Sequence, residues 1–310
     1  MDVWVEKYRP QKLKDMVLPE GCSRIVHNFV KHFDSSPHLL LHSLTPGTGK
    51  TSLAYVLANE LDADLLRLNA SDERGIQVIR DKVKRFAMTL SFTGQPKICF
   101  LDEADYLTAE AQASLRAMME EYANNVKFIL SCNELSRIIE PIQSRCIAVD
   151  FSRLPEDKVL ERLVYILEQE QVEFDLEILH EIVKRFWPSL RNMVNELQRQ
   201  FIEYGKINQK PLSYVFVAEK ILQGLQEGIN PFKLYNLIED ISDYERLLID
   251  IVQQIMKSQE LKASFKAKSI VLGAKYNYRQ KVGADNHLQL LAFLMELYYE
   301  YQKEKKMAAR

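Results

Sequence analysis

The amino-acid sequence predicts an α/β protein whose N-terminal half is built on a parallel β-sheet and whose C-terminal half is helical. Short apolar runs recur between residues 38 and 151, and segments with a helical spacing of apolar residues separate them. This alternation is typical of a parallel sheet with helices on both faces. Two polar motifs follow strands, and such sheets bind ligands at the carboxyl ends of their strands.

The composition limits the class of protein. Of 310 residues, 47% are hydrophobic and 27% are charged, as in ordinary soluble globular proteins. The net charge of −2 predicts no overall attraction to nucleic acid, so contact with DNA would need a local basic patch. Four scattered cysteines without a C-x-x-C pair favour reduced thiols in a cytosolic protein. We expect neither a signal peptide nor a membrane span.

Residues 1–20 are expected to form an ordered arm before a helix from about residue 21 to 33. Pro10 favours an extended backbone for the residues that precede it. The aromatic Tyr8 and the basic Arg9 can pack on an adenine ring. A purely structural arm explains them equally well.

The first chemical motif is the segment 43–51, with the sequence SLTPGTGKT, which lies between an apolar run and a helical pattern. Gly47 and Gly49 allow backbone N–H groups to turn toward phosphate oxygens, Lys50 adds a positive charge, and the Thr51 hydroxyl can bind Mg²⁺. Leu44 stands where the phosphate-loop pattern has its first glycine. An ordinary strand-to-helix turn is the alternative explanation.

The second motif follows the apolar run 98–101. Asp102 can hold Mg²⁺ directly or through water, and Glu103 can polarise an attacking water as general base. Acidic pairs after strands are common by themselves. A pair that comes about fifty residues after a glycine-rich phosphate loop predicts nucleotide binding.

Three further features have a simple explanation beside a functional one. Asn133 follows the run 126–131 and can sense a γ-phosphate or its attacking water, although a turn asparagine is simpler. The predicted helix 76–90 is rich in arginine and lysine, which suits contact with a nucleic-acid backbone but also describes a solvated face. Arg191 opens a predicted helix and can reach a phosphate, or it is an exposed arginine.

The chain is expected to contain three domains. Residues 1–151 form the sheet domain, and residues 152–208 form a small helical domain after the boundary at Pro155. Residues 209–310 start with a connecting stretch and continue as helices with apolar faces. This last domain contains no catalytic constellation, which indicates packing against copies of itself.

The motifs together resemble the small ATPase subunit of sliding-clamp loaders, as in replication factor C and its archaeal and phage relatives, within the AAA+ class. The segments that carry the resemblance are 4–10 (WVEKYRP), 68–75 (LNASDERG), 101–105 (LDEAD), 131–133 (SCN), 144–146 (SRC) and 190–198 (LRNMVNELQ). They cover residues 1 to about 200, in order and with appropriate spacing. The remainder resembles the family's collar in length and helical character only.

The resemblance implies an AAA+ P-loop domain, a helical lid domain and an all-helical collar, with ATP and Mg²⁺ as cofactors. The nucleotide-binding residues that it implies are Val5, Tyr8, Arg9, Pro10, Pro46, Gly47, Thr48, Gly49, Lys50, Thr51, Ser52 and Arg191. The catalytic residues that it implies are Lys50, Glu103, Asn133, Arg191 and, acting in trans on a neighbouring subunit's site, Arg145. Thr51 and Asp102 are the implied metal ligands. Arg74, Arg80 and Lys84 are the implied DNA contacts, and residues 90–92 are expected to dock on the clamp.

The resemblance further implies the function and the partners. We expect a clamp-loader ATPase subunit that binds a sliding clamp, primer–template DNA, copies of itself and at least one distinct subunit. Leu44 and the residues before Arg191 depart from cellular relatives. Phage clamp loaders are also irregular at the position of Leu44, which favours a phage or viral source acting in a host cell. The alternatives are another AAA+ DNA motor, for branch migration or helicase loading, and a subunit that binds ATP as a scaffold without hydrolysing it.

Overall fold

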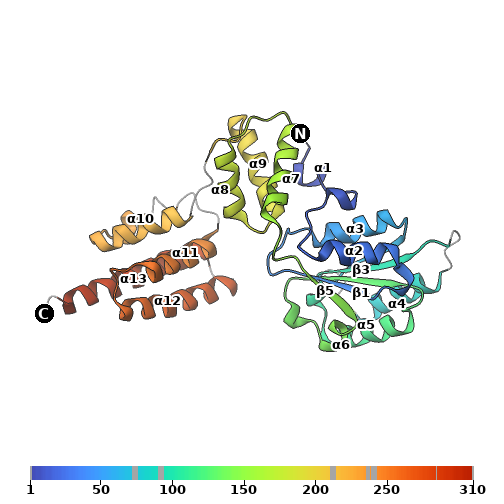
Figure 1. Cartoon of the computed structure of the whole chain (residues 1–310). Coiled ribbons are helices and arrows are strands. Elements are labelled where there is room, and N and C mark those ends of the chain that lie inside the picture. Colours follow the sequence, from blue (N-terminus) through green and yellow to red (C-terminus); the bar gives the residue numbers. More distant parts are fainter. Residues whose placement is uncertain are drawn as a thin grey trace. The chain divides into compact units, whose positions relative to one another are not determined.

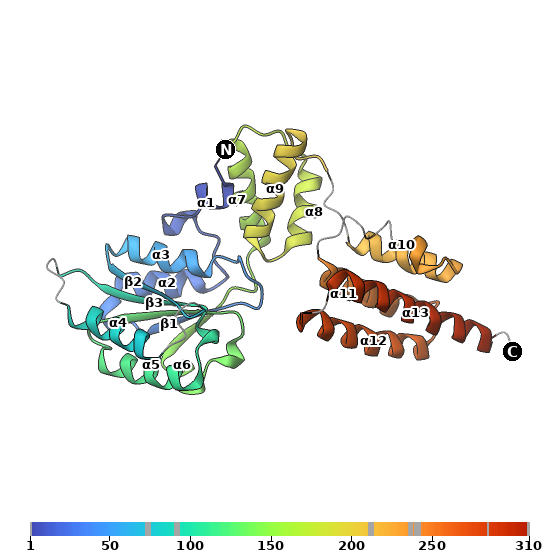
Figure 2. The ribbon, with the colours of Figure 1, turned by 180° about the vertical axis from the view of Figure 1, so that it is seen from behind.

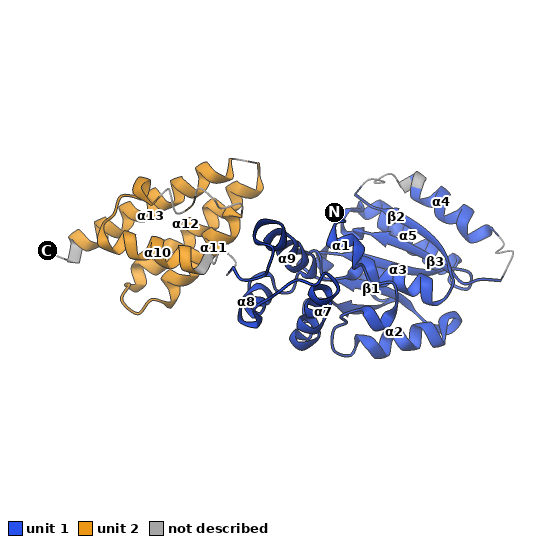
Figure 3. Ribbon diagram, turned by 90° about the horizontal axis from the view of Figure 1, so that it is seen from above, with its two compact units in different colours: residues 1–211 blue, residues 212–310 orange. Residues whose placement is uncertain are grey.

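The computed structural model describes residues 2–71, 76–89, 94–209, 214–234, 238, 243–283 and 285–308 (Figure 1). The chain divides into two compact units, residues 1–211 and 212–310 (Figure 3). The first unit holds the sheet, the arm and the helices up to α9, and the second is helical. The expected division of the first unit at residue 151 stays a prediction.

A five-stranded parallel sheet forms the centre of the first unit, as predicted. Its strands are β1 (His38–His42), β2 (Asp64–Asn69), β3 (Lys97–Asp102), β4 (Lys127–Cys132) and β5 (Cys146–Asp150). They lie in the order β2-β3-β4-β1-β5, and each neighbouring pair is parallel. The ends of β1, β3 and β4, which carry the two motifs and Asn133, are therefore adjacent.

Helices cover both faces of the sheet because alternate strand residues point to opposite sides. Leu39 and Leu41 of β1 belong to one buried cluster and Leu40 belongs to the other. The first face is covered by α2 (Cys22–Lys31) and α3 (Lys50–Glu60), and the second by α4 (Ile76–Met88), α5 (Ala109–Glu121) and α6 (Glu140–Gln143), as Figures 1 and 2 show. Thr108 caps the N-terminus of α5, since its hydroxyl accepts the Ala111 N–H at 3.2 Å.

Three further helices follow the sheet in the first unit, α7 (Glu156–Gln169), α8 (Leu176–Phe186) and α9 (Leu190–Tyr204), and the arm packs against α7 and α9. It begins with a short helix, α1 (Trp4–Lys7). The Trp4 side chain is 1% exposed and stacks on Phe201 of α9, with 5.4 Å between the ring centroids. Its backbone N–H donates to the side-chain oxygen of Gln198 at 3.0 Å. These contacts order the N-terminal arm, as the sequence predicts.

The second unit is formed by α10 (Tyr214–Glu227), α11 (Tyr244–Lys257), α12 (Ala263–Lys281) and α13 (Asn286–Ala308). Its buried core includes Leu248 and Ile251 of α11 and Phe293 of α13. Gly273 permits the close approach of α12 to α11, because a Cβ there would lie 2.8 Å from Val252 Cγ2. Within the described ranges, no helix is both long enough and apolar enough to span a bilayer.

Short 3₁₀ helices connect several of these elements. They are η1 (Leu13–Asp15), η2 (Phe33–Ser35), η3 (Ala104–Tyr106), η4 (Leu135–Arg137) and η5 (Pro231–Lys233). The cysteines are free thiols, as expected, and Cys22, Cys99 and Cys132 are buried. Burial raises the pKa of Cys22 to about 11, so this thiol is protonated near neutral pH.

Candidate functional site

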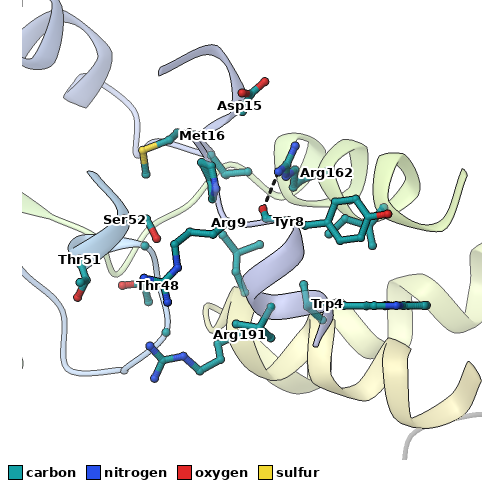
Figure 4. A pocket seen from close by; sticks show the side chains of 18 of the residues that line it. Trp4, Tyr8, Arg9, Asp15, Met16, Thr48, Thr51, Ser52, Arg162 and Arg191 are labelled. Carbon is teal, nitrogen blue, oxygen red and sulfur yellow. Dashed lines mark hydrogen bonds between the residues drawn. The ribbon is translucent and has the colours of Figure 1, made fainter. Parts of the chain in front are cut away.

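A pocket opens between the arm, the loop that follows β1, and helices α7 and α9 (Figure 4). The residues that line it are Trp4, Val5, Tyr8, Arg9, Pro10, Asp15, Met16, Val17, Gly47, Thr48, Gly49, Lys50, Thr51, Ser52, Arg162, Ile166, Leu190, Arg191 and Val194. They include every residue for which a nucleotide contact was predicted except Pro46. One side of the pocket is polar and belongs to the loop, and the other is largely apolar and belongs to the arm and the helices.

The loop after β1 has the backbone of an anion-binding turn. Gly47 and Gly49 have φ values of +79° and +106°, which residues with a Cβ rarely adopt. Helix α3 begins at Lys50, so its first N–H groups, which have no partner within the helix, face the loop. The Thr48 hydroxyl is buried and has no hydrogen-bond partner among the described residues. These donors fit the oxygens of a phosphate chain.

Leu44 does not disturb this turn. Among the described non-glycine residues, positive φ occurs at Asp62, Glu103 and Gln171, so the backbone at Leu44 does not require glycine. The Leu44 side chain is 79% exposed and lies outside the set that lines the pocket. The departure from the glycine pattern therefore leaves the phosphate-facing part of the loop intact.

Lys50 connects the loop to the end of β4. Its ammonium donates to the carbonyl oxygens of Ser43 at 3.2 Å and Thr45 at 3.4 Å, and to Asn133 Oδ1 at 3.0 Å. Burial lowers the pKa of Lys50, and the nearby carboxylates of Asp105 and Asp102 act in the opposite direction. The fold thus brings together Lys50 and Asn133, two residues that the sequence places 83 positions apart.

Asp102 lies at the end of β3 against the first turn of α3. Its Oδ1 accepts hydrogen bonds from Ser131 Oγ at 2.6 Å and from Thr51 Oγ1 at 3.2 Å. A hydroxyl and a carboxylate beside a phosphate-binding loop are hard oxygen ligands, and Mg²⁺ in nucleotide sites takes one or two such protein ligands besides phosphate and water. Thr51 and Asp102 therefore fit the metal that the sequence predicts. Within the described part of the chain, no cluster of three or more His, Cys, Asp or Glu residues forms an all-protein metal site.

The backbone N–H groups of Glu103 and Asn133 are held in place by hydrogen bonds to buried side chains. Glu103 has a φ of +56°, a strained value for a residue with a side chain, and its N–H donates to Ser131 Oγ at 3.0 Å. The N–H groups of Asn133 and Glu134 donate to Asp105 Oδ2 at 3.2 and 3.1 Å. Asp105 is buried, and its sequence context alone predicted no role for it. Its place as the last residue of the motif 101–105 is the signal that could have indicated one.

Helix α9 touches the phosphate loop directly. The N–H of Arg191 donates to the carbonyl oxygen of Gly47 at 3.1 Å, and Ser189 caps the helix by accepting the Asn192 N–H. Figure 4 shows the Arg191 side chain extending from the first turn of α9 toward the loop. Arg191 therefore lies beside the phosphate loop, and its contact with a phosphate stays a prediction.

The arm is fixed to α7 by a residue that no sequence motif singled out. Arg162 Nη2 donates to the carbonyl oxygen of Tyr8 at 2.8 Å, as the dashed line in Figure 4 marks. The Tyr8 hydroxyl donates to Glu170 Oε1 at 2.5 Å, and Lys7 pairs with the same carboxylate at 2.6 Å. Contact with Glu170 raises the pKa of Lys7. No local pattern marks Arg162, because its partner lies 154 residues away.

Arg145 does not line this pocket. Its guanidinium pairs with Glu120 of α5 and donates to the carbonyl oxygen of Pro141 at 2.6 Å. Arg80 and Lys84 are exposed on α4, while Ile79 and Val83 face the core. The other predicted partner contacts, Arg74 and residues 90–92, lie outside the described residues.

Comparison with known families and structures agrees with this geometry. Residues 40–153 match the model of the ATPase family associated with various cellular activities (AAA). The chain is similar in fold to the Holliday junction branch migration motor RuvB of Thermotoga maritima. One RuvB structure, of a variant with a single substitution, aligns with a TM-score of 0.58 at 15% identity over 94% of this chain and 90% of that chain.

Relatives that align over nearly the full length of the chain identify its family more closely than the fold match does. The replication factor C small subunit of Archaeoglobus fulgidus is 38% identical, over 96% of this chain and 97% of that protein. The replication factor C small subunit of Sulfurisphaera tokodaii is 39% identical, over 95% and 94% of the two chains. These are archaeal proteins, and they give no support to the expected phage source. Since the identity extends over nearly the whole length of both chains, this chain belongs to the replication factor C small-subunit family.

Proposed function

We propose that this clamp-loader subunit of DNA replication binds ATP with Mg²⁺ in the pocket of the first unit and hydrolyses it with the residues named below. The single observation that carries the proposal is the contact between Lys50 Nζ and Asn133 Oδ1 at 3.0 Å. It joins the phosphate loop to the polar end of β4, so both groups face the place where a terminal phosphate would lie. The family's AAA domain makes the chain an ATPase subunit.

The loop and the ends of the strands divide the catalytic work. Lys50 neutralises phosphate charge, while the N–H groups at the start of α3 cradle the oxygens. Thr51 and Asp102 would hold Mg²⁺, which supplies charge neutralisation between the phosphates. Glu103 accepts a proton from the attacking water, and Asn133 orients that water. Arg191 stabilises the phosphates from the side of α9.

The apolar half of the pocket suits an adenine ring. Val5, Tyr8 and Pro10 of the arm line the pocket together with Ile166 of α7 and Val194 of α9. Such a slot provides stacking and burial for a flat ring, while the loop provides the polar contacts. Because the slot includes residues from both the arm and the helices, binding of a nucleotide would hold these elements together.

Arg145 is proposed to act in trans. In the single chain it is bound to Glu120 and lies apart from its own pocket, which agrees with a role in a neighbouring subunit. An arginine supplied between subunits stabilises charge that develops on the transferred phosphoryl group. Neighbouring copies and at least one distinct subunit would be joined through the helical collar, residues 209–310.

The proposed partners, DNA and a sliding clamp, follow from the family to which the chain belongs. Arg80 and Lys84 present positive charge on the outer face of α4, where primer–template DNA would contact them through its phosphates. A sliding clamp would dock at the end of this helix. DNA and clamp would stimulate hydrolysis, and hydrolysis would release the loader. The site of action inside the cell, including a host cell, stays a prediction.

Steady-state ATP hydrolysis by the purified protein tests this function. Turnover is measured alone and then with primed DNA, the clamp and the companion subunits. We expect stimulation by clamp and DNA together, and we expect Glu103→Gln and Arg145→Ala to lose turnover by roughly 10²- to 10³-fold while both still bind ATP. Lys158→Gln, a change in an exposed ion pair on α7, is the control and should leave turnover unchanged.

The alternatives give different results in the same assay. A motor for branch migration or helicase loading would hydrolyse ATP without any response to a clamp. A scaffold subunit would bind ATP but show the same negligible turnover as Glu103→Gln. Normal hydrolysis by Arg145→Ala in the assembled loader would remove Arg145 from the proposed mechanism.

A further inference from the structure

Asp102 has a cationic neighbour that the two nucleotide motifs do not account for. Its Oδ2 lies 3.3 Å from Nη2 of Arg67, while its Oδ1 is bound by Ser131 and Thr51. Among the described residues, Arg67 is the only cationic side chain within salt-bridge distance of this carboxylate. Thr51 Oγ1 also lies 3.4 Å from Oδ2, so the two oxygens share this hydroxyl, and Oδ2 in addition faces the positive charge of Arg67.

The fold fixes Arg67 in this position. Arg67 lies on β2, an edge strand of the sheet, two residues before Asn69, which is paired with Asp102 in the parallel register. Its guanidinium also lies over the ring of Tyr55, 5.9 Å from the centroid. Tyr55 is one turn after Thr51 on α3, so Arg67 contacts both Asp102 and the helix that carries the other proposed metal ligand, Thr51.

The exposure of the two partners differs. The Arg67 side chain is 48% exposed, whereas that of Asp102 is 11% exposed. The arginine can therefore move into water at little cost, but the carboxylate cannot follow it. A metal that binds Asp102 also meets the positive charge of Arg67 a few ångströms away, and two cations that share a carboxylate weaken each other's hold on it.

We propose that Arg67 is a positioning residue that competes with Mg²⁺ for Asp102 and so sets the magnesium concentration at which the site takes up ATP. This inference rests on the proposed role of Asp102 as a metal ligand. In the metal-free state, Arg67 neutralises the carboxylate and reduces its repulsion of the nucleotide's phosphates. When the metal arrives, Arg67 gives up Oδ2 and turns outward to solvent.

Equilibrium binding of a fluorescent ATP analogue, titrated with Mg²⁺, tests this inference without reference to hydrolysis. For Arg67→Gln we expect the half-saturating Mg²⁺ concentration to fall two- to fivefold, because the competitor is gone. We also expect the analogue to bind more weakly in EDTA, because Asp102 is then uncompensated. Arg67→Lys, which keeps the charge, should remain close to the wild type.

A matched control is available on α9. Arg199 is 47% exposed and pairs with Glu196, which is 10% exposed, so this pair has nearly the same exposure as Arg67 and Asp102. Arg199→Gln should leave the magnesium requirement unchanged. An unchanged requirement in Arg67→Gln, or an equal fall in Arg199→Gln, overturns the inference.

Asp102→Asn separates this inference from the proposed function. If Asp102→Asn raises the magnesium requirement and Arg67→Gln has no effect, the metal ligand is right and the competition is wrong. If Asp102→Asn leaves the requirement at the wild-type value, the metal assignment fails, and the role of Arg67 fails with it.

Discussion

The backbone N–H of Arg191 donates a hydrogen bond to the carbonyl oxygen of Gly47, with 3.1 Å between nitrogen and oxygen. This bond joins the first turn of α9 to the phosphate loop. Gly47 has a φ of +79°, and a Cβ at this position would lie 2.7 Å from both Arg191 Cβ and Ser189 Oγ. Glycine is therefore required at position 47 for two reasons, its backbone conformation and the close approach of α9.

Comparing Gly47→Ala with Gly21→Ala separates the effect of backbone conformation from that of the close approach of α9. Gly21 has a φ of +80° but no atom within 4 Å of the place that a Cβ would take, so Gly21→Ala should cost only about 1 kcal/mol of stability through backbone strain. Gly47→Ala should cost more and should weaken ATP binding by roughly tenfold or more, because α9 must move away from the loop. Urea unfolding and binding of a fluorescent ATP analogue measure both effects. Equal losses of stability with normal ATP binding in Gly47→Ala would contradict the coupling.

Asp105 should affect turnover more than binding. Its carboxylate holds the N–H groups of Asn133 and Glu134, so Asp105→Ala should release the end of β4 and misplace the Asn133 side chain. We expect kcat to fall by roughly tenfold with KM for ATP nearly unchanged. Asn133→Ala should cause a similar fall, and the double variant should be no worse than either single one. A rise in KM alone would show that Asp105 serves binding instead.

Mixed assemblies test whether Arg145 acts between subunits. Each proposed site needs Glu103 from its own chain and Arg145 from a neighbour. An equal mixture of Glu103→Gln and Arg145→Ala chains should recover up to roughly a quarter of wild-type turnover, because one head-to-tail interface in about four then carries both intact residues. Turnover is measured in the assembled loader, with each variant alone as the control. No recovery in a mixture that assembles normally would place Arg145 in its own chain's site.

His38 should make the sheet sensitive to acid. The ring is buried at the start of β1, where its Nδ1 accepts the Phe128 N–H at 3.1 Å, and burial lowers its pKa from 6.5 to about 4. The positive charge of Lys127 acts in the same direction, and Asp34 in turn faces Lys127. Because the folded pKa is below the unfolded one, the stability from neutral His38 is complete above pH 6.5 and is lost as the pH falls toward 4.

The expected loss between pH 7.5 and pH 5 is about 2 kcal/mol, since each pKa unit corresponds to about 1.4 kcal/mol. Urea unfolding at the two pH values measures it. In His38→Gln, the amide oxygen can still accept the Phe128 N–H but does not titrate, so the difference between the two pH values should shrink. An equal pH dependence in the variant would assign the acid sensitivity to another group.

The order of elements and the chemistry of the loops were predictable from the sequence. Strand β3 with Asp102 at its end, and the loop that leads from β1 into α3, have local signals: a short apolar run, glycines at fixed spacing and a charged residue at a strand end. These signals involve residues close together in the chain, so the pattern alone specifies them. The same patterns predicted the parallel sheet and the place of its site.

Contacts between distant segments were not predictable in this way. Arg162 and Tyr8, Arg67 and Asp102, and Lys50 and Asn133 meet only after the sheet and the helices have packed. Leu44 shows the opposite: the sequence pattern marked it as a departure, but the structure shows that its backbone does not need glycine.

The sequence by itself therefore determined which residues can bind phosphate, metal and water, because those abilities belong to side chains and short loops. Only the tertiary structure decided that the arm and α9 line the pocket beside the phosphate loop, and that an arginine from an edge strand lies beside the proposed metal ligand Asp102. Such relationships depend on strand order and helix packing, which join residues far apart in the chain and leave no short-range pattern.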